Sequence, residues 1–262
     1  MEPTFFGNTK TPLYGVYHPP LLNKVGGSAV LLCYPVFQEY IRSHRAFCQL
    51  ASQLAKMGNH VFRFDYSSTG DSFGDTDEAN YDQWQDDIAL AADELRELSG
   101  ISNVSIVGLR FGATLACTSK LKRIKKMVLW DPIISGCSYL KTLTNMNKAM
   151  LTDSDRFPSP RNEVLTENFA NIIGFRIPQT LIKPINNAEI LSQDLNDVMS
   201  ISVVTSTDDE VVKQFATNLQ ETHGNSNYMS INTAGNWCEL SKMDETLIPK
   251  EILEYICGLF TK

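Results

Sequence analysis

The residue in the most unusual setting of this sequence is an arginine, Arg110, which stands between two glycines in Gly108-Leu109-Arg110-Phe111-Gly112. The β-branched run before Gly108 predicts a buried strand, and the small helix formers after Gly112 predict a helix. Glycines at this spacing are typical of a sharp strand-to-helix turn, where close packing leaves little room for Cβ atoms. The sequence therefore predicts a permanently protonated guanidinium, which is no nucleophile near neutral pH, at the tip of that turn.

An arginine at such a tip needs a counter-charge, because an unpaired buried charge is costly. The candidates are Glu39, in the loop after an early buried strand, and Asp208 and Asp209, after a late one. A structural salt bridge from Arg110 to Asp209 or Glu39 is one interpretation. The other is an anion receptor, in which the donor fork of Arg110 and the start of the next helix bind a carboxylate or phosphate. That interpretation favours an acidic small molecule, an acyl thioester or its phosphopantetheine arm as ligand.

Several stretches predict the elements that must position these side chains. Residues 14–20 read as an early edge strand, and residues 28–35 form the continuous apolar run expected of a buried parallel strand. Residues 44–58 and 81–100 carry apolar residues at helical spacing and end in glycine. Because strands alternate with helices, we expect an α/β fold with a mostly parallel sheet and helices on both faces.

The alternation is lost between residues 133 and 196, where prolines interrupt the chain and no clean buried strand is predicted. We therefore expect two parts, a core made of residues 1–132 and 197–262 and a cap insertion made of residues 133–196. The cap would lie over the carboxyl-terminal edge of the sheet, where open α/β sheets bind their ligands.

The composition of the 262-residue chain limits which classes of protein and partner are possible. Hydrophobic residues make up 43% and charged residues 20%, which is ample for a folded core. The net charge of −7 disfavours nucleic acid as a partner. No apolar run approaches the ~20 residues of a membrane span, and we expect no secretory signal because Met1-Glu-Pro-Thr is neither basic nor followed by an apolar run. The six cysteines are scattered, so we expect reduced thiols in a cytoplasmic protein, with no metal site and no cofactor.

Two stretches carry a resemblance to a known family. The segment CYPVFQEYIRSHRAFCQLASQLAKMGNHVFRFDYSSTGDS (33–72) resembles a pattern H-P-F-x-x-E followed by R-F-D-x-x-G-x-G-D-S, and residues 108–113 resemble an elbow G-L-R-x-G-A. The chain thus resembles the α/β-hydrolase superfamily, in its serine aminopeptidase-like branch with a cap, and is most similar to the exosortase-associated hydrolases. The resemblance implies an α/β-hydrolase fold outside the cap. It also implies a context of acyl chemistry, near acyl-ligase and acyltransferase functions of exopolysaccharide systems.

The resemblance further implies a triad of nucleophile, acid and histidine, in that order along the chain. Arg110 occupies the nucleophile position. Asp209, with Asp208 beside it, occupies the position of the acid in a D-x-V-V turn, although a carboxylate that caps the next helix is an equal alternative. Asn236, directly before Trp237, occupies the histidine position, and an amide takes no proton at neutral pH. We therefore expect a degenerate triad.

The backbone frame that would hold an oxyanion is expected to survive. One donor is the N–H of Phe111, and the other comes from Val36 or Phe37. Cys238 is the only thiol near the last loop, and no histidine is placed to activate it, so we expect a structural thiol. The predicted binding residues are Val36, Phe37, Phe111, Asp208 and Trp237.

The joint loss of nucleophile and base favours a non-hydrolytic accessory or binding protein for an acyl or other anionic small molecule. Acyl-carrier or acyltransferase proteins are candidate partners. An alternative is a lyase, isomerase, cyclase or acyl transferase, in which Glu39 or Asp209 acts as base and Arg110 stabilises an enolate or oxyanion. A thioesterase or esterase with a relocated nucleophile is a third hypothesis, and it needs a histidine within reach of a crevice hydroxyl or thiol. An open pocket with an unpaired Arg110 would favour the enzyme hypothesis. A collapsed pocket with Arg110 paired to an aspartate would favour the binding-protein hypothesis.

Overall fold

The main sheet has a mostly parallel arrangement, as expected. The computed structural model describes residues 1–21, 27–162, 168–190, 195, 197–233, 237–239 and 247–261. Within them the sheet consists of β1 (Glu2–Asn8), β2 (Thr11–His18), β3 (Ala29–Cys33), β4 (His60–Phe64), β5 (Val104–Leu109), β6 (Ile124–Trp130), β9 (Ile201–Thr205) and β10 (Ser226–Ser230). Its strand order is β1-β2-β4-β3-β5-β6-β9-β10. The pairs from β4 to β10 are parallel, and β1 and β2 form an antiparallel hairpin.

The outer edge of the sheet differs from the expectation. The sequence predicted an edge strand at residues 14–20, but residues 14–18 belong to β2, and β1 pairs along its outer side. Phe6 in β1 is buried against Phe62 and Phe64, whereas Phe5 is 62% exposed. The outermost strand is therefore held by its antiparallel pairing with β2 along its whole length and by the one buried ring of Phe6.

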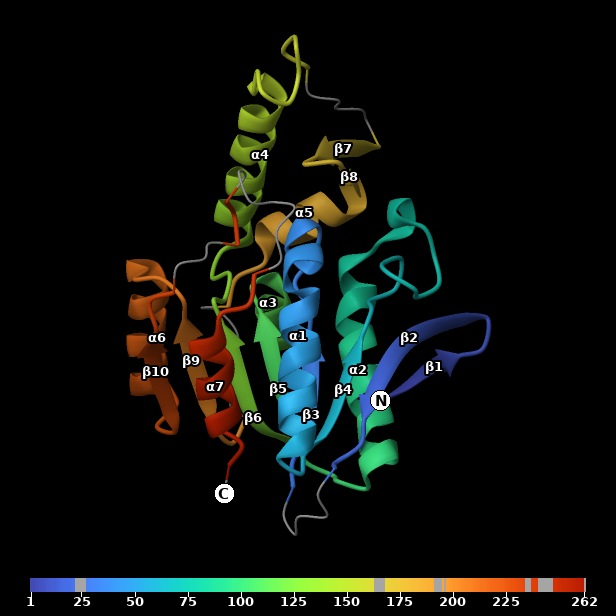
Figure 1. Ribbon diagram of the computed structural model, residues 1–262, viewed down its shortest axis with the longest axis vertical. Coiled ribbons are helices and arrows are strands. Elements are labelled where there is room, and N and C mark those ends of the chain that lie inside the picture. The colour runs from blue at the N-terminus through green and yellow to red at the C-terminus, as the bar shows by residue number, and fades with distance from the viewer. Residues whose placement is uncertain are drawn as a thin grey trace.

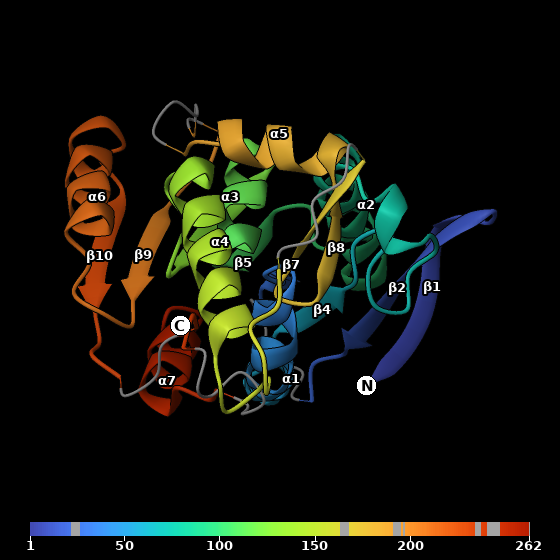
Figure 2. The same ribbon diagram turned by 90° about the horizontal axis from the view of Figure 1, so that it is seen from above.

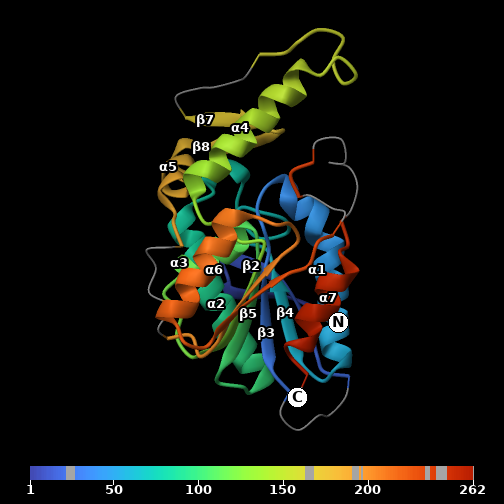
Figure 3. The same ribbon diagram turned by 90° about the vertical axis from the view of Figure 1, so that its left-hand side faces the viewer.

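Helices cover both faces of the sheet. They are α1 (Gln38–Lys56), α2 (Tyr81–Ser99), α3 (Phe111–Thr118), α6 (Glu210–Thr222) and α7 (Lys250–Gly258). Figure 2 and Figure 3 show α1 and α7 on one face, and α2, α3 and α6 on the other. Every residue of β3 and β5 is buried, because apolar side chains are covered on both sides. Among the described helices, none is long and apolar enough to cross a membrane.

In the described part of the chain, four elements stand between β6 and β9. They are α4 (Gly136–Thr152), β7 (Phe169–Ile172), β8 (Phe175–Pro178) and α5 (Gln179–Asn187). β7 and β8 pair with each other in a separate sheet, and no described residue of this segment belongs to a strand of the main sheet. Figure 1 shows it above the ends toward which the parallel strands point. Of the predicted cap, 163–167, 191–194 and 196 lie outside the described residues.

The chain enters and leaves this segment at one place. The N–H of Gly136 donates to the carbonyl of Ala188 at 2.9 Å, and the N–H of Ile190 donates to the carbonyl of Ile134 at 3.2 Å. A Cβ atom at Gly136 would lie 1.7 Å from the carbonyl oxygen of Ile185, so only glycine fits where the two crossings touch. The segment is therefore attached to the core by two adjacent backbone crossings.

Candidate functional site

The turn between β5 and α3 has the sharp geometry that the sequence predicts, with Arg110 at its tip. Arg110 has φ 53° and ψ −124°, a region that costs a non-glycine residue about 1–3 kcal/mol. A Cβ atom at Gly112 would lie 2.2 Å from the carbonyl oxygen of Tyr34, and one at Gly108 would lie 2.6 Å from the Cα of Ala113. Both glycines are thus required by close packing of α3 against β3 and β5.

The guanidinium of Arg110 is paired. Its Nε donates to Oε1 of Glu39 at 3.0 Å, and the Glu39 side chain is fully buried whereas that of Arg110 is 17% exposed. Its two other nitrogens contact the carbonyl oxygen of Asp131 and the sulfur of Cys238, each at 3.4 Å. Burial is the largest single effect and lowers the pKa of Arg110, but Glu39 together with Cys238, Asp131 and Tyr139 outweighs it and leaves that pKa above its ordinary value. The salt-bridge interpretation therefore fits better than the anion receptor.

Glu39 is saturated by its other neighbours as well. Its Oε2 accepts a hydrogen bond from the hydroxyl of Tyr139 at 3.1 Å, and its Oε1 also accepts from the thiol of Cys238 at 3.4 Å. Burial, and secondarily Glu39, raise the pKa of Cys238 to about 11 against the opposing effect of Arg110. We call Glu39, Arg110, Tyr139 and Cys238 the Glu39 cluster. It joins α1, the turn before α3, α4 and the last loop in one buried polar contact, and its thiol stays protonated at neutral pH.

The two aspartates expected near Arg110 lie elsewhere. Asp208 and Asp209 are exposed, and Asp209 caps α6, since its carboxylate accepts from the N–H groups of Val211 at 2.9 Å and Val212 at 3.3 Å. The predicted contact between Asp209 and Arg110 is therefore wrong. A carboxylate at the first turn of a helix is stabilised by the free N–H groups there, and this capping interaction holds Asp209 at the surface.

A different aspartate, Asp131, occupies the crevice at the end of β6. It is 6% exposed and accepts from the N–H of Ser206 at 2.6 Å, the hydroxyl of Ser206 at 2.7 Å and Nε1 of Trp237 at 2.7 Å. The sequence could have pointed to it, because Asp131 comes directly after the apolar part of the predicted strand KMVLWDP (126–132). Trp237 is buried here and packs edge-on against Trp130, which makes it part of the core. Asn236, at the expected histidine position, lies outside the described residues.

All four histidines of the chain are described, and all have other neighbours than the Glu39 cluster. The pairs are His18 with Arg63, His44 with Cys48, His60 with Tyr17, and His223 with the carbonyl of Val198. The His44–Cys48 contact, at 3.8 Å, lies on the exposed side of α1. Among the described residues, no three His, Cys, Asp or Glu side chains lie close enough together to hold a metal ion.

The loop that precedes α1 forms a second sharp turn beside the first. Phe37 has φ 58° and ψ −136°, close to the values of Arg110, and each of these two residues directly precedes a helix. Val36, Phe37 and Phe111 are buried, and a Cβ at Gly112 would touch the backbone of this same loop. The structure thus brings the three predicted oxyanion-frame residues to neighbouring turns.

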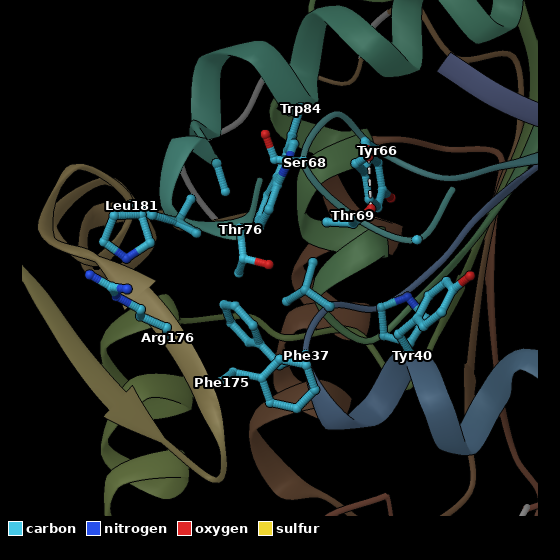
Figure 4. A pocket seen from close by; sticks show the side chains of 15 residues that line it. Phe37, Tyr40, Tyr66, Ser68, Thr69, Thr76, Trp84, Phe175, Arg176 and Leu181 are labelled. Carbon is cyan, nitrogen blue, oxygen red and sulfur yellow. Dashed lines mark hydrogen bonds between the residues drawn. The ribbon is translucent and has the colours of Figure 1, made fainter. Parts of the chain in front are cut away.

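The cavity that this loop borders lies between the core and the segment from α4 to α5, which is called the cap below. It has a volume of about 130 Å³. Figure 4 shows its aromatic walls, which come from Phe37, Tyr66, Trp84 and Phe175. Its lining residues are Pro35, Val36, Phe37, Tyr40, Tyr66, Ser68, Thr69, Gly70, Thr76, Ala79, Trp84, Phe175, Arg176, Pro178 and Leu181. Of the predicted binding residues, Val36 and Phe37 are in this set, whereas Phe111, Asp208 and Trp237 are not. The charged side chain at its edge is that of Arg176, which sequence reasoning missed.

Comparison with known proteins gives a likeness of structure only. No protein-family model matches this chain, and no curated protein matches its sequence. Mouse alpha/beta hydrolase domain-containing protein 10 aligns with a TM-score of 0.55 at 15% identity, over 99% of this chain and 98% of the other. The esterase Pf2001 of Pyrococcus furiosus aligns with a TM-score of 0.65 at 14% identity, over 100% of this chain and 93% of the other. Proline iminopeptidase of Mycobacterium smegmatis aligns with a TM-score of 0.66 at 12% identity, over 99% of this chain and 97% of the other. These identities establish a shared fold and nothing finer.

Proposed function

We propose that this chain, which has the α/β-hydrolase fold, has no serine-hydrolase turnover and acts as an accessory or binding protein for an acyl or other anionic small molecule. The observation that carries the proposal is the buried ion pair of Arg110 with Glu39 at the tip of the turn. Ester cleavage by this fold needs a nucleophile there and an imidazole beside it. The tip carries a paired cation instead, and the histidines have partners elsewhere.

The enzyme alternative needs a carboxylate that can reach a substrate proton. Glu39 is fully buried, and both of its oxygens accept hydrogen bonds from Arg110, Cys238 or Tyr139. Asp209 is committed to capping α6 at the surface. These contacts favour binding over non-triad catalysis, and they favour the cavity beside Phe37 over the Arg110 tip as the place where a ligand enters.

The wider role follows from the resemblance of residues 33–72 to the exosortase-associated hydrolases. It favours a cytoplasmic chain with a degenerate triad that works beside enzymes of acyl transfer, with acyl-carrier or acyltransferase proteins as partners. A binding protein with an apolar cavity suits that setting, because it can hold an acyl group without cleaving it.

The proposal is tested with the unmodified protein, a fluorophosphonate probe and p-nitrophenyl butyrate. We expect no covalent labelling, and ester release no faster than with the heat-denatured protein. The matched variants are Ser68→Ala and Ser72→Ala, because both serines are buried in the loop after β4, and Ser68 also lines the cavity. Labelling of any serine in the folded protein, or ester turnover abolished by one of these variants, would refute the proposal in favour of a relocated nucleophile.

A further inference from the structure

The size of the cavity under the cap restricts what can enter it. Its volume is about 130 Å³. An apolar cavity of ~150 Å³ in an engineered protein binds benzene, so the present one holds a body of about one ring or a short branched chain. A long acyl chain or a phosphopantetheine arm exceeds this volume. The cavity therefore selects compact apolar groups.

The walls favour a flat group. The ring of Phe37 has its centroid 6.5 Å from that of Trp84 and 5.9 Å from that of Phe175, and Tyr66 lies 5.7 Å from Trp84. Trp84 and Tyr66 are 1% and 2% exposed, so neighbouring side chains hold them in place. Rings at these separations offer edges and faces against which an aromatic ligand packs favourably.

The edge of the cavity carries a cation whose partner is readily exchanged. Nη1 of Arg176, in β8, lies 3.1 Å from Oδ2 of Asp77, and the two side chains are 54% and 47% exposed. An ion pair this exposed contributes little to stability, so a ligand carboxylate can replace Asp77. The guanidinium also stacks 4.0 Å from the ring centroid of Phe169, which restricts its position. The guanidinium of Arg110, by contrast, is already paired with the buried Glu39.

We infer that this cavity binds a small carboxylate with an apolar body of about one ring, such as an aryl carboxylate, and that Arg176 binds the carboxylate group. Asp77 holds Arg176 at the edge while the cavity is empty. The inference rests on the proposed function, for which it names the class of ligand. It assigns the recognition of the anion to the cap and moves it away from Arg110.

The test is a calorimetric titration of the full chain with benzoate and with its neutral analogue benzamide. We expect benzoate to bind at least tenfold more tightly than benzamide, because a charged bidentate pair is stronger than a neutral hydrogen bond. Arg176→Gln should remove this preference, because it weakens benzoate binding far more than benzamide binding. The matched control is Arg156→Gln, which changes another cap arginine beside a partly exposed aspartate, Asp153 at 3.5 Å, and should change neither affinity.

Two further variants locate the binding. Asp77→Asn removes the carboxylate that competes for Arg176 and should tighten benzoate binding a few-fold at low salt. Thr76→Leu places a larger apolar side chain at an exposed position that lines the cavity. It should lower the affinity for benzoate and for benzamide by the same factor, because it fills space that both ligands need.

The inference is overturned if folded protein binds no benzoate at millimolar concentration, if Arg176→Gln leaves the benzoate preference intact, or if Thr76→Leu leaves both affinities unchanged. Circular dichroism of each variant establishes that it is folded. Ester turnover in the preceding assay would instead overturn the proposed function, so the two failures are distinguished by separate measurements.

Discussion

At the scale of single residues, the ion pair between Glu39 and Arg110 is the charged contact of the Glu39 cluster. The variant Glu39→Gln keeps the shape of the side chain and removes its charge. It leaves the Arg110 guanidinium, only 17% exposed, without its counter-charge. Because an uncompensated buried charge is strongly destabilising, we expect the free energy of unfolding to fall by about 3 kcal/mol, measured by equilibrium unfolding in urea.

The double variant Glu39→Gln, Arg110→Met is the control for this prediction. Removing both charges leaves no unpaired ion, so it should recover much of the lost stability. If Glu39→Gln alone unfolds at the same urea concentration as the parent, the ion pair does not stabilise the turn.

A second prediction at this scale concerns pH. Burial, with Arg63 as a secondary cause, lowers the pKa of His18 to about 4 from 6.5. Between these values the unfolded chain binds a proton that the folded chain does not, so stability rises with pH across this window and falls on acidification. In the parent, Nε of Arg63 donates to Nε2 of His18 at 3.2 Å. His18→Gln keeps an acceptor for that donor but has no side chain that titrates. In urea unfolding at about pH 7, 5.5 and 4.5, the free energy of unfolding of the variant should depend less on pH than that of the parent. Equal pH dependence in the two proteins would contradict a lowered pKa for His18.

At the scale of elements, the contact of α3 with β3 depends on one missing side chain. In Gly112→Ala the new Cβ would lie 2.2 Å and 2.5 Å from the backbone oxygens of Tyr34 and Cys33. These atoms cannot rotate away, so α3 or the loop must move. We expect a loss of about 3 kcal/mol or more, as for overpacked core positions at the upper end of their range, measured by urea unfolding.

The control for that prediction is Gly258→Ala at the end of α7. No heavy atom lies within 4 Å of a Cβ at Gly258. Alanine costs less backbone entropy than glycine in a helix, so this variant should be neutral or stabilised by about 0.5–1 kcal/mol. Similar destabilisation of both variants would mean that the close approach of α3 to β3 is not the cause.

Local pattern predicted most of the elements near the site. Residues 28–35 and 81–100 were expected as a strand and a helix, and they contain β3 and α2. The helix expected at residues 44–58 begins six residues earlier, at Gln38. Its first turns bury polar side chains, Glu39 and Arg42 among them, whose partners lie far along the chain, so no apolar period marks them. The start of α1 is thus set by tertiary contacts.

Of the candidate site, the sequence predicted the position of a residue only where a recognisable turn determines it. Arg110 was located from its glycines, and Glu39 was one of its named partners. Tyr139 could not be found, because its contact with Glu39 joins residues 100 positions apart. Arg176 was missed for a similar reason, since β8 and its ion pair with Asp77 arise from the folding of the cap and not from a local period.

At the scale of the whole molecule, the cap is attached where the chain crosses twice. A linker of a few glycines and serines can join Ile134 to Ile190, because the carbonyl of the first accepts from the N–H of the second at 3.2 Å. We expect the capless chain to fold, with lower stability, because the cap adds no strand to the main sheet. It should lose benzoate binding together with Phe175 and Arg176. Circular dichroism, urea unfolding and calorimetry measure these outcomes.

The full-length protein is the reference for that comparison. Tyr139 is lost with the cap, so its stacking on Phe111 and its bond to Glu39 are lost too, and the unfolding midpoint should fall. An aggregated chain, or one that unfolds without a cooperative transition, would mean that cap and core form a single folding unit.

The position of β1 at the outside of the sheet affects how copies of the protein behave in concentrated solution. Its free side offers backbone donors and acceptors to another chain, next to the exposed ring of Phe5. Pro3 removes one donor, and a net charge of −7 makes copies repel one another at neutral pH. High ionic strength or a pH near the isoelectric point weakens this repulsion, so precipitation through edge-to-edge strand pairing is the hazard to avoid in storage and crystallisation.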